Sequence, residues 1–148
     1  LERVITIFPW IAIIDKFQHW VYEFPNHTLE ERAERWVAIN DEFATGVIDL
    51  SGLEEYRKYS WQRQLHLFEV PFYYVEYGFA QLGAVGVWKN YITKGQAAIE
   101  DYKAFLKLGN TKSIPNIYET AGVKFEFSES YISDLMQFVQ VELAAIHN

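Results

Sequence analysis

One run of the sequence gathers side chains that could bind a ligand. From His66 to Trp88 the chain reads HLFEVPFYYVEYGFAQLGAVGVW, which places an imidazole, three phenols and two carboxylates among apolar residues. Tyr73 and Tyr77 are four positions apart, so they share one face of a helix. Two phenols on a buried face need hydrogen-bond partners. The run therefore predicts a buried helix whose tyrosines are held by the protein or by a ligand.

His66 stands just ahead of this helix. Pro71 is suited to the first position of a helix, and a chain that leads into a proline is pushed out of helical geometry. We therefore expect His66 on a lead-in segment that can fold its imidazole over the tyrosines. Spacing alone leaves two interpretations open, a structural histidine with satisfied hydrogen bonds and a functional histidine.

Other catalytic patterns are missing from the sequence. The zinc motif H-E-x-x-H, the nucleophile turn G-x-S-x-G and the phosphate loop G-x-x-x-x-G-K-[ST] are absent, and there is no cysteine. His19 and Glu23 have the spacing of a ligand pair, but their aromatic neighbours favour a packed contact. We expect no metal to be bound by this chain alone.

The elements that must position these residues are all predicted to be helical. Apolar spacing and turn residues predict helices at 2–23 with a kink near Pro9, from Thr28 to about Thr45, from Pro71 to about Thr93, at 96–108, at 113–120, and from Ser128 or Ser130 to about Ile146. Residues 53–60 are expected to be a short helical or irregular piece. Thr28 and Glu31 form a capping-box pattern, and Gly46 is the predicted C-cap. Only GVKFEFS alternates like a strand, and without a pairing partner it is expected to be a connection. The prediction is an all-α, irregular helical array in which residues 1–148 form a single unit.

Three glycines inside the predicted helix indicate close packing. Gly78, Gly83 and Gly86 each cost about 1 kcal/mol relative to alanine in a helix interior. Their density implies that a neighbouring helix or a ligand approaches closely.

Composition narrows the classes of function. A net charge of −7 without a clustered basic face argues against nucleic acid as a partner. Glu76 and Gln81 in the middle of the apolar run argue against a membrane span. Aromatic residues make up 18% of the chain, an excess that predicts a partner-facing surface and allows self-association. The lack of cysteine suits the cytoplasm, and a start at Leu1, without Met and within a predicted helix, leads us to expect a fragment.

Two segments together resemble a known family. IDKFQHWVYEFPNHTLEERAERW, residues 14–36, and HLFEVPFYYVEYGFAQLGA, residues 66–84, are similar in order and spacing to the C-terminal part of the catalytic domain of oligoendopeptidase F. That enzyme is a zinc metallopeptidase of the thimet-oligopeptidase family. The resemblance implies a zincin-like, all-helical domain with two halves around a deep channel, in which H-E-x-x-H and a downstream glutamate hold zinc. Those ligands would lie upstream of Leu1, so zinc would be a cofactor of the parent enzyme.

The resemblance also implies roles for residues of the second segment. His66 would contact the substrate backbone or the tetrahedral intermediate. Tyr77 or Tyr73 would donate a hydrogen bond to the oxyanion, and Tyr74 would line the channel. The implied function is the substrate-binding C-terminal half of an oligoendopeptidase that cuts short peptides. This half would need the missing N-terminal part of the same protein and would be inactive alone.

Two alternatives stay open beside this assignment. The more distant thimet-type pattern puts Phe72, Glu76 and Phe79 at the positions where it has tyrosines. From another class of function, the chain could be a stand-alone helical module whose aromatic groove binds a peptide or a hydrophobic ligand.

Overall fold

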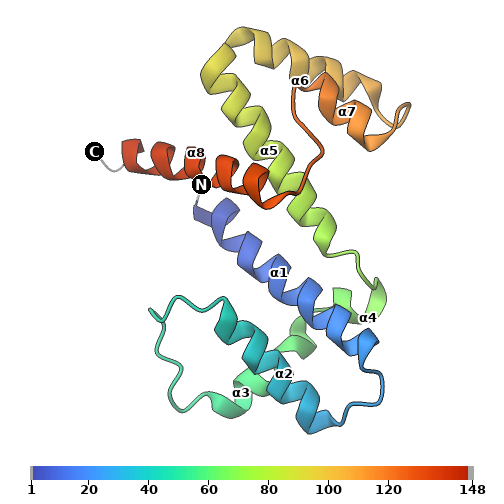
Figure 1. Ribbon diagram of the computed structural model, residues 1–148, viewed down its shortest axis with the longest axis vertical. Coiled ribbons are helices and arrows are strands. Elements are labelled where there is room, and N and C mark those ends of the chain that lie inside the picture. Colours follow the sequence, from blue (N-terminus) through green and yellow to red (C-terminus); the bar gives the residue numbers. More distant parts are fainter. Residues whose placement is uncertain (1, 147–148) are drawn as a thin grey trace. The chain divides into compact units, whose positions relative to one another are not determined.

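The computed structural model describes residues 2–146, and every regular element among them is helical. Figure 1 labels the eight α-helices, and the all-α prediction is confirmed. The GVKFEFS segment is a connection without strand structure. No helix within the described range is long and apolar enough to cross a membrane. The described residues fall into two compact units, 2–78 and 79–146, and the expectation that the chain acts as a single unit stays a prediction.

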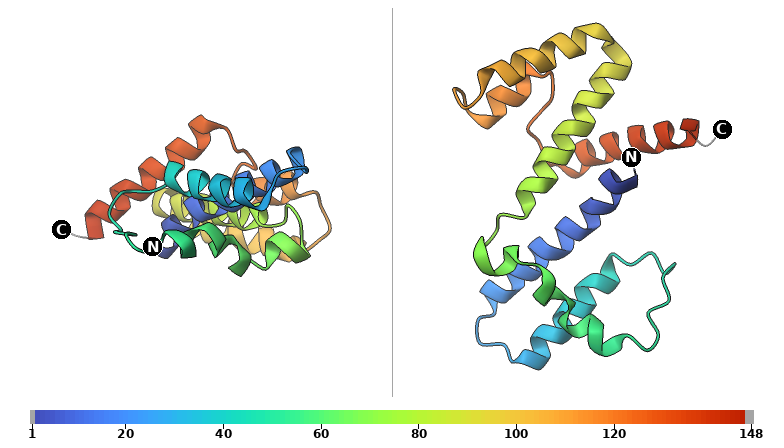
Figure 2. Two further views of the ribbon diagram at one scale, coloured as in Figure 1. Left: turned by 90° about the horizontal axis from the view of Figure 1, so that it is seen from below. Right: turned by 180° about the vertical axis from the view of Figure 1, so that it is seen from behind.

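The first unit is assembled around α1 and α2. Its elements are α1, Glu2–Glu23, α2, Leu29–Glu42, α3, Glu54–Tyr59, a 3-10 helix, Ser60–Arg63, and the short α4, His66–Glu69. Phe17 and Trp36 are almost fully buried in its core, with ring centroids 5.0 Å apart. The Trp36 indole donates to Ser60 Oγ at 2.8 Å, which ties the 3-10 helix to α2. Figure 2 shows these helices from two further directions.

Helix α2 begins as predicted but ends earlier. Thr28 Oγ1 accepts from the Glu31 N–H at 3.1 Å, and Glu31 Oε2 accepts from the Thr28 N–H at 2.7 Å, so the capping box is confirmed. The C-cap is Phe43, and the predicted continuation to Thr45 with Gly46 as the cap is wrong. Residues 41–50 are all exposed, so no packed face supports a further turn of helix.

The chain around Pro71 also differs from the prediction. Pro71 does not begin a helix, and Val70 before it is non-helical, with φ −139° and ψ 75°. Phe72 takes a left-handed backbone conformation, with φ 60°, and α5, Val75–Lys94, begins only after this reversal. Tyr73 therefore precedes the helix, and the predicted helix face shared by the two tyrosines does not form.

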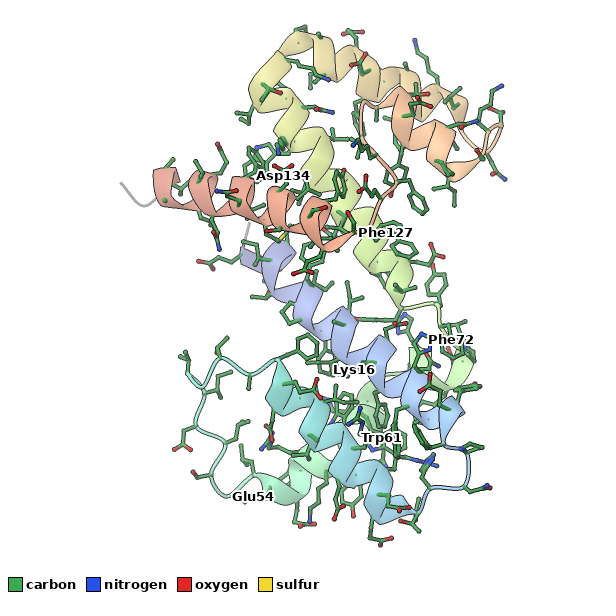
Figure 3. The ribbon with its side chains drawn as sticks, in the orientation of Figure 1. Lys16, Glu54, Trp61, Phe72, Phe127 and Asp134 are labelled. Carbon is green, nitrogen blue, oxygen red and sulfur yellow. The ribbon has the colours of Figure 1, made fainter. Side chains whose placement is uncertain are left out.

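The second unit contains most of α5 and the three helices that follow it. These are α6, Gln96–Leu108, α7, Ile114–Thr120, and α8, Glu129–Ile146. Helix α8 packs on α5 through Trp88 and Phe138, whose ring centroids are 4.7 Å apart. Lys89 Nζ lies 2.5 Å from a carboxylate oxygen of Asp134, the residue labelled on α8 in Figure 3.

The last two helices begin where the sequence predicted. Ser113 is the N-cap of α7, and Pro115 lies in its first turn. Ser128, rather than Ser130, caps α8, because Ser128 Oγ accepts from the Tyr131 N–H at 3.3 Å.

The predicted close approach to the glycines is found at two of the three positions. A Cβ atom on Gly86 would lie 2.7 Å from Val123, and one on Gly83 would lie 2.8 Å from the ring of Tyr118. Both distances are too short for real atoms, so glycine is required unless these side chains move. A Cβ on Gly78 would make only an ordinary contact, at 3.5 Å, with α1.

Candidate functional site

Four rings form one cluster in the first unit, which we name the His–Tyr cluster. The His66 ring centroid lies 4.9 Å from that of Tyr74, 5.6 Å from Tyr77 and 6.3 Å from Tyr73. The Tyr77 ring also contacts Tyr73 at 5.7 Å and Tyr74 at 5.1 Å, both edge to face. The structure therefore brings together the four residues to which the resemblance gives roles, His66, Tyr73, Tyr74 and Tyr77. His66 reaches the tyrosines from the first position of α4.

A hydrogen-bond chain with a defined direction runs into this cluster. Trp10 Nε1 donates to Gln64 Oε1 at 3.3 Å, and because an indole N–H can only donate, this contact fixes the orientation of the Gln64 amide. Gln64 Nε2 then faces His66 Nδ1 at 2.7 Å. An amide NH₂ can only donate, so Nδ1 of the neutral imidazole accepts and the ring proton lies on Nε2. Nε2 in turn donates to Tyr77 Oη at 3.1 Å.

The direction of this series of hydrogen bonds leaves the hydroxyl proton of Tyr77 available to bond a ligand. Tyr77 Oη is the acceptor from His66, so its own O–H is not used in that bond. Tyr77 is 38% exposed and Tyr73 is 47% exposed, so both residues lie at the surface, where a ligand can contact them. The expectation of a buried tyrosine face is wrong, because the chain reverses at Phe72 and leaves these rings at the surface.

Tyr74 lies deeper than the other two tyrosines. It packs against the core of the first unit, beside Trp10 and Gln64. Burial raises the pKa of the Tyr74 hydroxyl above its ordinary value of 10.0, although hydrogen bonding to Trp10 acts in the opposite direction. The Tyr74 phenol therefore remains neutral at any physiological pH.

Trp10 and Gln64 were not predicted as part of the site. They are 54 residues apart in the sequence, and neither belongs to a recognisable motif. Only the fold, which sets α1 beside the segment before α4, brings them together. Of the alternative positions, Glu76 is exposed, and Phe79 packs on Phe125 and Phe127 at 5.6 Å and 4.3 Å in the second unit.

The described residues do not fit a bound metal ion. Within residues 2–146 no group of three or more His, Cys, Asp or Glu side chains is placed to hold one. His19 Nε2 lies 3.5 Å from an Asp15 carboxylate oxygen, and His27 Nε2 accepts from Arg32 Nε at 2.7 Å. His147 lies outside the described residues.

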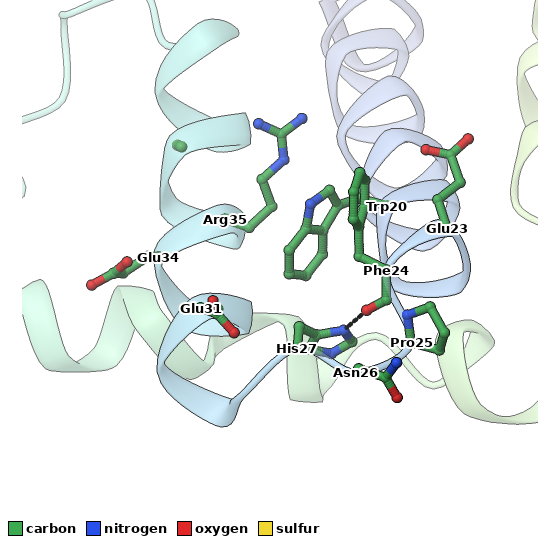
Figure 4. A pocket seen from close by; sticks show the side chains of 10 residues that line it. Trp20, Glu23, Phe24, Pro25, Asn26, His27, Glu31, Glu34 and Arg35 are labelled. Carbon is green, nitrogen blue, oxygen red and sulfur yellow. Dashed lines mark hydrogen bonds between the residues drawn. The ribbon is translucent and has the colours of Figure 1, made fainter.

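Several open cavities lie elsewhere on the chain. One, of about 610 Å³, lies at the turn between α1 and α2, where Figure 4 shows Trp20 facing Arg35. Another, of about 520 Å³, lies among α5, α6 and α7 and is lined by aromatic rings that include Trp88 and Phe105. Neither of these two cavities is lined by a residue of the His–Tyr cluster, so the cluster is a separate surface feature.

Solved structures with a similar fold are peptidases. A protein assigned as an oligoendopeptidase F matches 96% of this chain with a TM-score of 0.81 and 29% sequence identity. Pz peptidase A, solved with an inhibitor, matches 94% of this chain with a TM-score of 0.78 and 29% identity. The chain spans a quarter of the length of each, 25% in both cases. A search of curated proteins finds no match.

A family comparison agrees with these structures. The profile of peptidase family M3 matches residues 2–137, which is most of the chain and includes the whole His–Tyr cluster. The resemblance inferred from the two sequence segments is confirmed. The chain therefore belongs to peptidase family M3 and forms part of its peptidase domain.

Proposed function

We propose that the chain is the substrate-binding C-terminal half of a zinc-dependent oligoendopeptidase that hydrolyses peptide bonds in short peptides. The His–Tyr cluster would form part of the wall of the substrate channel. Membership of peptidase family M3 supports a peptide as the substrate. The coverage of only 25% of the solved relatives supports a partner in the remainder of the same protein.

The available hydroxyl proton of Tyr77 is the observation that carries this proposal. When water attacks a peptide carbonyl, negative charge develops on the carbonyl oxygen. An O–H group aimed at that oxygen lowers the barrier by about 3 kcal/mol, the scale measured for one oxyanion donor. His66 supports this role, because its Nε2–H holds Tyr77 Oη and polarises the phenol so that it becomes a better donor.

The other cluster residues have supporting roles in the proposal. Tyr73 is the second candidate donor, because the residue is exposed and its ring packs edge to face on Tyr77. His66 contacts the substrate backbone only when a peptide displaces Tyr77 from Nε2, since both ring nitrogens are otherwise engaged. Tyr74 lines the channel as a neutral, partly buried surface.

Zinc is assigned to the remainder of the protein. The residues described between 2 and 146 do not provide a ligand set, so the chain's own contribution is to bind and orient the peptide and to donate hydrogen bonds. On this basis we propose that the isolated chain is inactive.

We also propose that the protein is cytoplasmic. A separate proposal is that the rest of the protein covers an exposed apolar surface of this chain. Large exposed apolar side chains in the first unit include Leu29, Tyr56 and Phe68, at 69%, 77% and 57% exposure. Their apolar surface favours contact with the rest of the protein, or with a second copy in its absence.

The proposal is tested by comparing the isolated chain with the full-length protein that contains it on an internally quenched peptide. The full-length protein should cleave the peptide and lose that activity when a chelator removes zinc. The isolated chain should show no turnover with or without added zinc. Chelator-sensitive turnover by the isolated chain would contradict the assignment of zinc elsewhere. A full-length protein that binds peptides without cutting any would support the binding-module alternative instead.

A further inference from the structure

A buried amide outside the His–Tyr cluster holds the segment that leads into it. Gln18 of α1 is 3% exposed, and no other polar side chain in the described part of the chain is classed as buried. Its Oε1 accepts from the backbone N–H of Phe72 at 2.8 Å. The two residues are 54 positions apart, so this hydrogen bond fastens the reversal between α4 and α5 to α1.

Phe72 needs such a fastening because its backbone is strained. It has a φ of 60°, and no other non-glycine residue in the described range has a positive φ. In this region the Cβ of an L-residue crowds its own carbonyl, so the conformation persists only where the surroundings impose it. The ring of Phe72 also packs on His19 and Tyr22, with centroids 4.9 Å and 5.0 Å apart. Figure 3 shows Phe72 beside α1.

The position of the cluster follows from this reversal. Tyr73 comes directly after Phe72, and its N–H donates to the Val70 carbonyl at 3.1 Å, which closes the turn. A change of Phe72 to an ordinary negative φ would redirect the chain and carry Tyr73 and Tyr77 away from His66. We propose that Gln18 is a positioning residue that holds Phe72 in its left-handed conformation and thereby sets the His–Tyr cluster. Its effect on peptide cleavage rests on the proposed function.

Packing alone does not explain why a glutamine stands at position 18. Its Nε2 is buried and makes no hydrogen bond within the described residues. A buried donor without a partner costs free energy, so a methionine of similar length would fill this space better if only volume mattered. The carbonyl oxygen is therefore the part of the side chain that this position uses.

The first test measures the geometry of the cluster in the chain itself. Gln18→Met removes the acceptor at nearly constant volume, and Gln62→Met, at an exposed position of the same unit, is the matched control. By NMR, Gln18→Met should lose the ring-to-ring contacts between His66 and Tyr77 while keeping those between Phe17 and Trp36 in the core. Unchanged His66–Tyr77 contacts, at the intensity of the Gln62→Met control, would overturn the proposal.

A second substitution separates positioning from general stability. Glycine adopts a positive φ without strain. In a Phe72→Gly background, the contacts within the His–Tyr cluster should therefore no longer depend on the side chain at position 18. The double variant Gln18→Met/Phe72→Gly should fold and show the His66–Tyr77 contacts, even if Gln18→Met alone fails to fold. A double variant that lacks those contacts or does not fold would mean that Gln18 acts on something other than Phe72, which overturns the proposal.

Kinetics of the full-length protein test the consequence for cleavage. Gln18→Met should lower kcat/KM about tenfold relative to Gln62→Met, the effect of losing one well-placed hydrogen bond. Phe72→Gly should restore most of the loss. A wild-type protein without peptidase activity would refute the proposed function, while the NMR comparison would still decide the role of Gln18. Lost ring contacts with an unchanged rate would show that this positioning has no role in cleavage.

Discussion

Replacing Gly86 with alanine should destabilise the chain, although alanine favours a helix. The gain in helix propensity is about 1 kcal/mol. Against it, the added Cβ would lie 2.7 Å and 3.2 Å from the two methyl groups of Val123. Val123 is 5% exposed, and a β-branched side chain cannot rotate freely away from the clash. Overpacking of this kind costs about 1–3 kcal/mol, so the net loss should be about 1 kcal/mol.

Gly78→Ala is the matched control in the same helix. Its Cβ would lie 3.5 Å from Ile11, an ordinary contact, so the substitution should gain up to about 1 kcal/mol. Thermal unfolding followed by circular dichroism should move the Tm of the two variants in opposite directions, by about 3 °C each. In a Val123→Ala background, Gly86→Ala should become stabilising because the clash is gone. Equal stability of Gly86→Ala and Gly78→Ala in the wild-type background would refute the packing argument.

Three further predictions concern the first unit. Thr28→Ala should cost about 1 kcal/mol of unfolding free energy near neutral pH. Hydrogen bonds from Thr28 hold the pKa of Glu31 below its ordinary value of 4.5, so the carboxylate's contribution is present above that pH and is lost as the pH falls through the lowered pKa. The Thr28 backbone N–H donates to this carboxylate and survives Thr28→Ala, so the pH dependence is tested with Glu31→Gln, which cannot ionise. Urea titrations should show the difference between wild type and Glu31→Gln shrinking in acid, and a constant difference would contradict the ionised carboxylate's part in the capping box. Burial raises the pKa of Tyr74 above 10.0, so its contribution is present below that pH and is lost as the pH rises through the raised pKa. Tyr74→Phe should make the unfolding free energy less sensitive to alkali, and an unchanged alkaline profile would argue against its burial. Gln64→Leu removes the donor to His66 Nδ1, and ¹⁵N spectra of the imidazole should show a loss of the form protonated on Nε2. An unchanged tautomer would mean that Gln64 does not orient His66.

Local sequence signals predicted much of the fold. Thr28 and Glu31 form the predicted capping box because such a box needs only residues three positions apart. The same holds for Ser128 at the start of α8. The glycines of α5 correctly predicted a close neighbour at two positions. A glycine lowers the stability of a helix, so its presence implies close packing, but the sequence does not say which residue, such as Val123, packs there.

The errors and omissions arise where distant parts of the chain decide the structure. Gly46 has a positive φ of 71°, as a helix cap often does, but α2 has already ended because the following residues are not packed. Pro71 is compatible with a helix start, yet the contact between Phe72 and Gln18 favours a reversal at that point. The link from Trp10 to Gln64 likewise spans 54 residues and leaves no periodic trace in the sequence. Sequence reasoning found the rings of the site but not the residues that orient them.

The central claim is that the Tyr77 hydroxyl donates to the peptide carbonyl as charge develops on its oxygen. The most direct test is kcat/KM of Tyr77→Phe in the full-length protein, with Tyr73→Phe measured separately. Tyr59→Phe is the matched control, because Tyr59 lies in the same unit, is 49% exposed and is not part of the His–Tyr cluster. A donor worth about 3 kcal/mol predicts a fall of roughly a hundredfold for Tyr77→Phe, with Tyr59→Phe unchanged. Cleavage by both Tyr77→Phe and Tyr73→Phe at the rate of the Tyr59→Phe control would contradict the account.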